Sequence, residues 1–508
     1  MRNPARALNT HRAPALHSFW ISAYICCGIL LGCVTVSNQF LHWFVIPVLI
    51  CGTLIGTDAV DSIRGHLDVF DPVGIIGLLG FHFFFLAPLL HVYWDYWMLY
   101  IDPPPDWRDW LGEMAVLNML GLIVYHISRT ILLKERQKHV YRTLWRVDWQ
   151  NVLPVVGIAL FITGGLQLWV YARSGGILGY IQIVTDGSDG FRGFGWIFMI
   201  SESFPIVAFM LFAMYATRKK FFQSWMILVI VLAVYLVLKI LFGGLRGSRS
   251  NTVWGLFWAI GIIHFWIRPI SRQWILTGCL FLILFMYFYG FYKSAGLDGL
   301  EAFQSSAARA ELTEQTGRSL EGLLLGDLAR SDIQAFLLYR LRTYPTDYEY
   351  ALGKTYLGGA TILIPRSIWS NRPLGKVKEG TEAQYGKNSY RPGAWESSKV
   401  YGLAGEAMLN FGSAMVPPAF LLFGVVVGYV QRLMTRLHAM DIRCMLLPFL
   451  INLCFVVLVS DSDNIVFFLI KDGFVPFIVL FLCTKKLSFI SSNSGLRQTC
   501  NVHAQVGW

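Results

Sequence analysis

Continuous apolar runs of about 20 residues recur along this chain, and each is long enough to cross a bilayer as a helix. A segment in hydrocarbon must satisfy its own backbone hydrogen bonds, which a helix does and a lone strand does not. Hydrophobic residues make up 55% of the 508 positions and charged residues only 14%, as in chains that cross a membrane repeatedly. Because the runs are continuous rather than alternating, the sequence predicts an all-α polytopic membrane protein rather than a barrel.

The apolar runs predict about twelve transmembrane helices. The expected spans are 19–36, 40–57, 70–93, 110–133, 152–171, 195–216, 222–242, 251–267, 273–292, 404–430, 444–460 and 464–484. They divide the chain into helices one to nine in residues 1–292, a large extracytoplasmic loop in 293–403, helices ten to twelve in 404–484, and a cytoplasmic tail in 485–508.

Lysine and arginine are concentrated in alternate loops, and this bias sets the expected orientation. If the N-terminus is cytoplasmic, the short outer loops hold few basic residues, namely Arg108, Arg173, Arg192, Arg246 and Arg249. Both termini are therefore expected in the cytoplasm. The formal net charge of +11 follows from this topology. Because the basic residues are spread over many loops, no nucleic acid partner is expected.

The cysteines and histidines indicate no metal centre. All nine cysteines fall in spans or inner segments, without a CxxC pair, so neither a disulfide framework nor a metal motif is predicted. Of the histidines, only His91 is expected near an outer membrane edge, so no histidine-ligated metal site is predicted. The sequence predicts no metal and no cofactor.

A glycine-rich hinge lies between two apolar runs and reads GGLRGSRS over residues 243–250. The charge bias places this hinge on the outer side, where arginine is unexpected unless an anion requires it. Arg246 and Arg249 are therefore candidates for anion binding. The alternative is that both arginines anchor the flanking helices at the membrane interface.

The outer loop divides into two parts. Apolar residues at three- and four-residue steps predict an amphipathic helix over 320–341, which lies on the membrane or caps the bundle. A lid that shapes a substrate site is the alternative. The second part, 344–373, interleaves tyrosine and tryptophan with arginine and lysine, a composition that suits carbohydrate. Its Gly-Lys-Thr at 353–355 lacks the upstream glycine of a nucleotide loop.

The segment after the loop carries a carboxylate into the expected tenth span. Glu406 and Asn410 are four residues apart and share a helix face, so both side chains would point into one cavity. A carboxylate at the membrane edge is a functional candidate. The alternative is a structural glutamate paired with an arginine. Pro417 and Pro418 are expected to break this helix.

Two further pairs of charged residues are expected to have structural rather than catalytic roles. Asp461 and Asp463 are expected in a solvated turn on the outer side. Lys471 and Asp472, inside the last span, are expected to neutralise one another or a neighbouring helix.

The order of these motifs resembles a family. The glycine-rich arginine hinge, the loop that ends in Ile-Pro-Arg-Ser-Ile-Trp and Arg-Pro, and the Gly-Glu-(x3)-Asn-Phe-Gly segment look like the Wzy-type oligosaccharide repeat-unit polymerases, which build O-antigen, capsule or exopolysaccharide. The resemblance covers roughly residues 150 to 430. It implies a membrane glycosyltransferase with a GT-C-like helical bundle in the bacterial inner membrane.

The resemblance also implies the substrates and partners. Such enzymes transfer a glycan from undecaprenyl pyrophosphate to another lipid-linked repeat unit on the outer side of the membrane. The implied partners are this donor and acceptor, membrane lipid and a chain-length regulator protein.

The roles that the resemblance implies fall on ten residues. The catalytic group is Glu406, as the base or acceptor-orienting residue, with Arg246 and Arg249 as the pyrophosphate clamp. The expected substrate contacts are Arg366, Arg372, Asn410, Tyr401, Tyr356, Lys239 and Arg192.

Two other functions stay open. An O-antigen ligase uses the same donor, but such enzymes are associated with a histidine in the long outer loop, and residues 293–403 contain none. A transporter or flippase for lipid-linked sugars would be expected to show internal repeats, which the sequence does not display.

Overall fold

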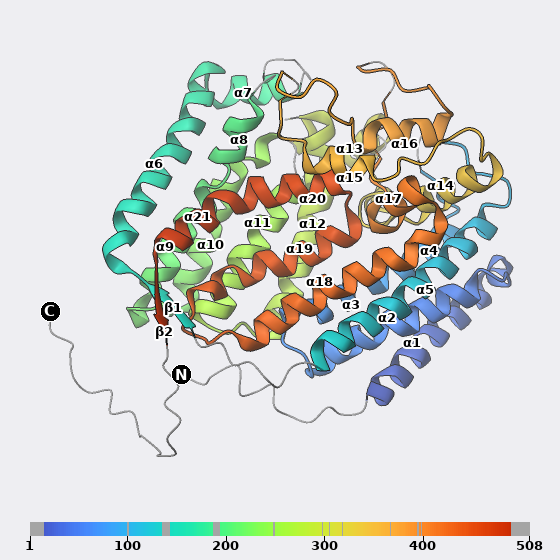
Figure 1. Cartoon of the computed structure of the whole chain (residues 1–508), viewed down its shortest axis with the longest axis horizontal. Helices are drawn as coiled ribbons and strands as arrows, with labels where there is room; N and C mark the ends of the chain where they lie inside the picture. The colour runs from blue at the N-terminus through green and yellow to red at the C-terminus, as the bar shows by residue number, and fades with distance from the viewer. Residues whose placement is uncertain are drawn as a thin grey trace.

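The computed structural model describes residues 15–488, apart from 99–100, 135–142, 186–190, 192–193, 247–248, 297, 304, 317–318, 366, 394–395 and 398. These residues form a helical bundle with one pair of short strands (Figure 1). The chain is a mostly helical membrane protein, as the apolar runs predicted.

The helices of the first half are α1 (Ala15–Val36), α2 (Val45–Arg64), α3 (Pro72–Phe81), α4 (Ala87–Tyr93), α5 (Trp107–Lys134), α6 (Trp149–Arg173), α7 (Gly176–Thr185), α8 (Gly195–Ser201), α9 (Phe204–Ala216), α10 (Trp225–Leu241), α11 (Arg249–Ile262) and α12 (Arg272–Ala295). Those of the second half are α13 (Ser306–Thr316), α14 (Ser331–Thr343), α15 (Lys354–Ala360), α16 (Lys376–Tyr385), α17 (Gly402–Phe411), α18 (Val416–Arg436), α19 (Leu447–Val459), α20 (Ser462–Phe468) and α21 (Phe474–Leu482).

Short irregular helical turns connect or interrupt these helices. The π-helical turns are η3 (His82–Leu86), η8 (Ile263–Ile267), η10 (Gly322–Asp327) and η13 (Leu469–Gly473). The 3-10 turns are η2 (Asn38–Phe40), η6 (Lys220–Gln223), η7 (Gly244–Arg246), η9 (Asp298–Phe303), η11 (Ser413–Met415) and η12 (Ile442–Met445). The turn η13 lies between α20 and α21, within the apolar helical segment Ser462–Leu482.

Within the described residues, eight helical segments are long and apolar enough to cross a membrane. They are Leu16–Val36, Val45–Arg64, Pro72–Tyr93, Trp107–Leu132, Trp149–Arg173, Gly195–Ala216, Ser413–Arg436 and Ser462–Leu482. Four shorter apolar helices, Trp225–Leu241, Asn251–Ile267, Leu280–Lys293 and Leu447–Val459, coincide with the other four expected spans. The twelve-span count therefore stays a prediction.

The expected tenth span, 404–430, is not one continuous helix. Helix α17 ends at Phe411, and Gly412 takes a φ of 83°, a left-handed conformation that favours glycine. The apolar span is Ser413–Arg436 instead. The helix does break near Pro417 and Pro418, as expected, but just before them, because these prolines lie in the first turn of α18, where a missing N–H is harmless.

Helices α5 and α18 pack along one another at glycines. A Cβ at Gly424 would lie 2.7 Å from the Tyr125 carbonyl oxygen, and a Cβ at Gly121 would lie 2.6 Å from Phe420 Cδ2. Gly424 therefore permits the close approach of the two backbones, and Gly121 leaves room for the Phe420 ring, as small residues do in membrane bundles.

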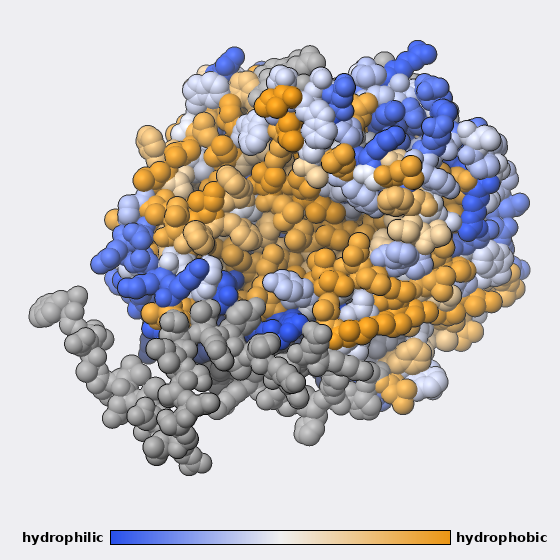
Figure 2. All heavy atoms as spheres, viewed as in Figure 1, coloured by the Kyte–Doolittle hydropathy of each residue, from blue (hydrophilic) through white to orange (hydrophobic). Residues whose placement is uncertain are grey.

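The segment expected as an outer loop packs on one end of the bundle. Helix α14 contacts α5, α16 and α17, and α15 contacts α20. The helix predicted over 320–341 is interrupted by η10 and continues as α14, which is largely buried and caps the bundle. Figure 2 shows polar side chains over this end and apolar side chains over the middle of the visible face.

The strands lie at the opposite end of the bundle (Figure 1). Strand β1 (Thr143–Val147) pairs antiparallel with β2 (Thr484–Ser488), with Trp145 opposite Lys486. Charged groups of Arg443 and Lys486 lie 5.1 and 4.8 Å from the centre of the Trp145 ring. The start of the expected cytoplasmic tail is thus a strand.

Candidate functional site

Glu406 is the centre of a buried network that joins three helices. Its Oε1 accepts hydrogen bonds from the hydroxyls of Thr355, at 2.7 Å, and Ser462, at 2.5 Å, and its Oε2 accepts from the Ser462 amide at 2.6 Å. Asn410 donates to the Thr355 hydroxyl at 2.6 Å and accepts from the Gly353 amide at 2.9 Å. Glu406 and Asn410 do share one face, as predicted, and Thr355 and Ser462 complete the set.

We call Glu406, Asn410, Thr355 and Ser462 the Glu406 network. Its carboxylate and amide oxygens are engaged within the protein, and Glu406 is 3% exposed. Helix α15 approaches α20 closely here, since a Cβ at Gly359 would lie 2.7 Å from Ser462 Oγ. Both carboxylate oxygens are taken by α15 and α20, so a substrate reaches Glu406 only if these helices separate.

Asp461 adjoins the Glu406 network and holds the start of α17. Its carboxylate accepts from the amides of Tyr401, at 3.0 Å, and Gly402, at 2.8 Å. Lys376 Nζ donates to its Oδ2 at 2.5 Å. The carboxylate thus caps the positive N-terminal end of a helix. The expectation of a solvated turn is wrong for Asp461, which is fully buried.

The electrostatics of this region favour a protonated Glu406. Glu406 lies on α17, outside the apolar span Ser413–Arg436. Burial raises the pKa of its carboxyl to about 7, and the negative charge of Asp461 adds to this shift. Desolvation disfavours the charged form because the protein interior solvates an anion poorly. Hydrogen bonds from Ser462 and Thr355 act in the opposite direction.

The tyrosines expected to contact sugar differ in access. Tyr401 is fully buried, and its hydroxyl accepts from Gln384 Nε2 at 2.6 Å. Tyr356 follows Thr355 on α15 and is 37% exposed. Burial of its hydroxyl raises its pKa, and the charges of Glu406 and Asp461 add to this shift. Tyr356 is therefore the member of this group whose ring offers an open surface.

Arg372 binds backbone rather than facing a cavity. One guanidinium nitrogen donates to the carbonyls of Thr361, Ile362 and Ile364, at 2.8, 2.5 and 2.9 Å. It thereby satisfies carbonyl groups that follow the end of α15. Arg366 and Arg192 lie outside the described residues, and of Arg249 only the backbone, which begins α11, is described.

Arg246 belongs to a second cluster, centred on Glu202. Glu202 lies in the turn between α8 and α9 and is 1% exposed. It forms ion pairs with Arg246 and with Lys471, whose Nζ lies 2.7 Å from Oε2, and it accepts from Asn251 Nδ2 at 2.5 Å. We call Glu202, Arg246, Lys471 and Asn251 the Glu202 cluster. The Arg246 guanidinium also lies 4.1 Å from the centre of the Phe198 ring.

Tyrosine hydroxyls fix the hinge that carries Arg246. Tyr171 on α6 donates to the Leu241 carbonyl at the end of α10, and Tyr289 on α12 donates to the Gly244 carbonyl. Tyr292, one turn further along α12, donates to the Leu245 carbonyl at 3.0 Å. These bonds satisfy carbonyls that a helix end leaves without intrahelical partners. The hinge is therefore held by neighbouring helices on both sides.

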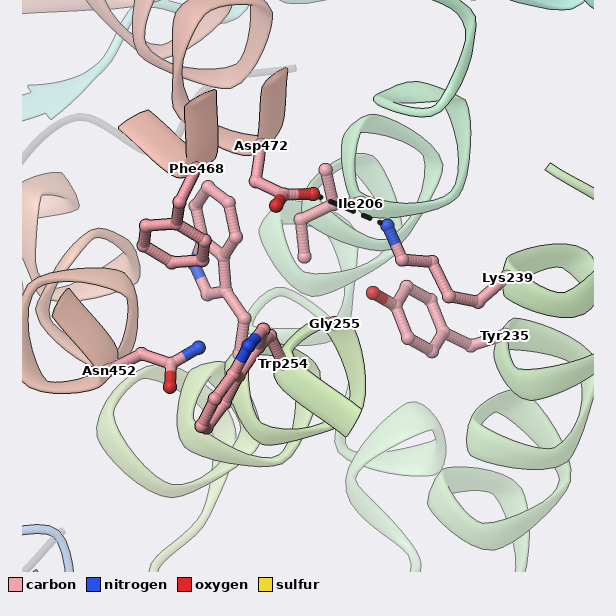
Figure 3. Close-up of a pocket in the computed structure, with 9 residues that line it drawn as sticks. Ile206, Tyr235, Lys239, Trp254, Gly255, Asn452, Phe468 and Asp472 are labelled. Carbon is pink, nitrogen blue, oxygen red and sulfur yellow. Dashed lines mark hydrogen bonds and ion pairs between the residues drawn. The ribbon is translucent and has the colours of Figure 1, made fainter. Parts of the chain in front are cut away.

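Lys239, on α10 before the hinge, lines a small pocket (Figure 3). Its Nζ lies 3.5 Å from Asp472 Oδ1, and the two groups point toward one another. A Cβ at Gly255 would lie 2.7 Å from Lys239 Cε and 2.8 Å from the Tyr235 hydroxyl, so α11 lies close to these side chains of α10. The Tyr235 hydroxyl has no hydrogen-bond partner among the described residues, and Asn452 lies on the other side of the pocket.

The structure places the predicted site residues in two groups. Ser462, at the start of α20, contacts Glu406, and Lys471, in η13 at its end, contacts Glu202. Nine residues of helix separate these contacts by roughly 14 Å. Arg246 and Lys239 belong to the second group, whereas Glu406, Asn410, Tyr401 and Tyr356 belong to the first.

Sequence reasoning did not single out Glu202, Thr355, Lys376 or Ser462. The sequence did contain an indication for Glu202, because a carboxylate within the expected span 195–216 is costly unless it has a partner. Within the described residues, no group of three or more histidine, cysteine or acidic side chains is placed to hold a metal ion. Comparison with protein-family models, curated proteins and solved structures finds no match for this chain.

Proposed function

We propose that this chain is an oligosaccharide repeat-unit polymerase of the Wzy type, with a GT-C-like bundle in a bacterial inner membrane. It would transfer a growing glycan from undecaprenyl pyrophosphate to a second lipid-linked repeat unit on the outer side. Membrane lipid and a chain-length regulator protein would be its partners. The proposal rests on the order of the sequence motifs and on the geometry of the Glu202 cluster.

One observation carries the proposal: Arg246 and Lys471 both pair with the Glu202 carboxylate, and one cation is enough to neutralise it. The Arg246 side chain is 22% exposed, whereas the Glu202 side chain is fully enclosed. A guanidinium with a spare hydrogen-bonding edge suits a phosphate oxygen, to which arginine gives paired hydrogen bonds. Arg249, at the start of α11, would act on the same anion together with the helix dipole.

The reaction needs a nucleophile, a leaving group and a proton acceptor. A hydroxyl oxygen of the acceptor sugar would form the new bond to the anomeric carbon of the donor as the bond from that carbon to the pyrophosphate oxygen breaks. Undecaprenyl pyrophosphate leaves, and the hydroxyl proton passes to a base. A carboxylate with a pKa of about 7 suits proton transfer near neutral pH, which supports Glu406 as that base.

That role requires a second conformation. In the present one Thr355 and Ser462 occupy the Glu406 carboxylate, so α15 would have to move away from α20 when substrate binds. Tyr356, exposed on the same helix, would then face the sugar. Asn410, Tyr401 and the arginines of the outer segment would complete the groove.

The test is complementation of a polymerase-deficient strain with Arg246→Ala or Arg249→Ala. We expect single repeat units at the cell surface and no long polymer, because the donor pyrophosphate is not held. Arg173→Ala is the matched control, since the Arg173 guanidinium also lies on aromatic rings, 5.5 Å from the centre of Trp169, at the end of a span. It should retain long polymer.

The same experiment separates the alternatives. A flippase defect would leave no repeat units at the surface, and a ligase defect would leave long polymer on the lipid carrier but none on the lipid A core. Normal long polymer in both arginine variants would exclude the proposed clamp.

A further inference from the structure

Lys471 and Asp472 are neighbours in the chain, yet they pair with different helices. Lys471 reaches Glu202 in the turn between α8 and α9, and Asp472 reaches Lys239 on α10. Successive residues of a helix point in different directions, and the π-helical turn η13 places both here inside the bundle. Such turns are frequent at functional sites.

These residues form a series of alternating charges. In order, its members are Lys239, Asp472, Lys471, Glu202 and Arg246, so three cations accompany two carboxylates. Isolated charges are expensive in a low-dielectric interior, where each is expected to have a partner. The series as it stands has one cation more than it can pair, and an added anion would balance it.

The two cations of Glu202 are not equivalent. Lys471 is 5% exposed and lies inside the bundle, whereas the Arg246 side chain is 22% exposed at the hinge. The Nε of Arg246 is buried without a hydrogen-bond partner among the described residues, so the exposed part of the guanidinium is what an anion can reach. Arg246 is therefore the member that an incoming anion reaches first, and Lys471 is the member that stays with Glu202.

We propose that Lys471 is a positioning residue that allows Arg246 to exchange Glu202 for a phosphate group of the lipid-linked donor. When the guanidinium turns to the phosphate oxygens, Lys471 and Asn251 keep Glu202 paired, so no buried carboxylate is left alone. Without Lys471, Glu202 would hold Arg246 as its sole cationic partner and compete with the phosphate. This inference rests on the proposed function, in which Arg246 binds the donor pyrophosphate.

The test measures binding of inorganic pyrophosphate to the purified full-length protein in detergent, at constant ionic strength, together with thermal unfolding of each variant. We expect Lys471→Gln to weaken binding about tenfold or more, because the competing carboxylate is no longer neutralised. Glu202→Gln should keep binding. The double variant Glu202→Gln with Lys471→Gln should restore it, and so should the conservative variant Lys471→Arg.

A purely structural role of Lys471 predicts a different pattern. The double variant would then bind as weakly as Lys471→Gln, and this result in a folded protein would overturn the proposal. Wild-type binding by Lys471→Gln would overturn it as well. Should Lys471→Gln fail to fold, the folded double variant decides, since restored binding supports the exchange and lost binding refutes it.

Arg246→Ala separates this inference from the proposed function. If Arg246→Ala binds pyrophosphate as the wild type does, the phosphate is not held at the hinge, and both proposals fall. If Arg246→Ala loses binding while Lys471→Gln keeps it, the clamp stands and only the role of Lys471 is refuted.

Discussion

Lys376 on α16 and Asp461 before α20 form an ion pair that protein encloses on all sides, with Nζ 2.5 Å from Oδ2. The pair connects the segment 293–403 to the apolar helical segment Ser462–Leu482. Two amides at the start of α17 complete the coordination of the carboxylate.

Lys376→Met should destabilise the protein strongly. Removal of one partner leaves a buried charge without its counter-ion, at a cost of about 3–5 kcal/mol. Thermal unfolding in detergent would show this as a lower midpoint, and the added change Asp461→Asn should recover part of the loss. Lys387→Met is the matched control, because Lys387 pairs with Glu349 in an exposed position and such pairs contribute about 0–1 kcal/mol. Equal effects of the two lysine variants would contradict the enclosed pair.

Glu406→Gln should remove a pH dependence of stability. The pKa of this carboxyl is about 7 in the folded protein and near its ordinary 4.5 in an unfolded chain, so the folded state binds the proton more tightly. Stability from this group is complete below pH 4.5 and is lost as the pH rises through 7. The loss amounts to about 3 kcal/mol.

The measurement is the unfolding midpoint of both proteins from about half a pH unit below the unfolded pKa to about one unit above the folded pKa. Wild-type stability should fall with rising pH, and the glutamine variant, which resembles the protonated acid, should be flatter. Parallel curves would show that Glu406 does not titrate in this interval. Asp461 and Tyr356, which face Glu406, are unchanged in both proteins.

Gly424→Ala should weaken the contact between α5 and α18. The added Cβ would lie 2.7 Å from a backbone carbonyl oxygen of Tyr125, which cannot move without shifting its helix. Overpacking of this kind costs roughly 1–3 kcal/mol. Gly157→Ala on α6 is the control, because a Cβ there has no neighbour within 4 Å. A glycine-to-alanine effect of the same size at both sites would argue against close packing at Gly424.

The orientation can be tested with single cysteines at two exposed lysines. A cysteine at Lys387, in the outer segment, should react with a membrane-impermeant thiol reagent in intact spheroplasts. A cysteine at Lys219, in the turn after α9, should react only after the membrane is opened. The opposite pattern would reverse the topology, and the protein without an added cysteine gives the background.

The helical membrane fold could be predicted because apolar length depends on local sequence alone. Each expected span contains an apolar helix, although the tenth is interrupted at Gly412, whose left-handed conformation no apolar average reveals. The pair of strands was missed because residues 143–147 and 484–488 meet only through the packing of distant helices.

The candidate site was predictable in residue type more than in arrangement. Glu406 and Asn410 share a face because both lie on one helix, which four-residue spacing predicts. The burial of Asp461 depends on Lys376, which lies in another element 85 positions away. No local pattern indicates that pairing, and the same holds for Lys471 and Glu202, whose partnership follows from the arrangement of three separate helices.

In the present conformation, hydrogen bonds and an ion pair join residues 293–403 to the first turn of α20. Thr355 bonds to Glu406 and Ser462, and Lys376 and Tyr401 bond to Asp461. Separation of this segment from α20 would therefore expose these polar groups. If the chain is a polymerase as proposed, a chimera that transplants only residues 293–403 from a polymerase of different sugar specificity would leave the first turn of α20 facing foreign partners. Specificity should therefore be exchanged with that turn included, as a block that crosses the boundary between the loop and the membrane.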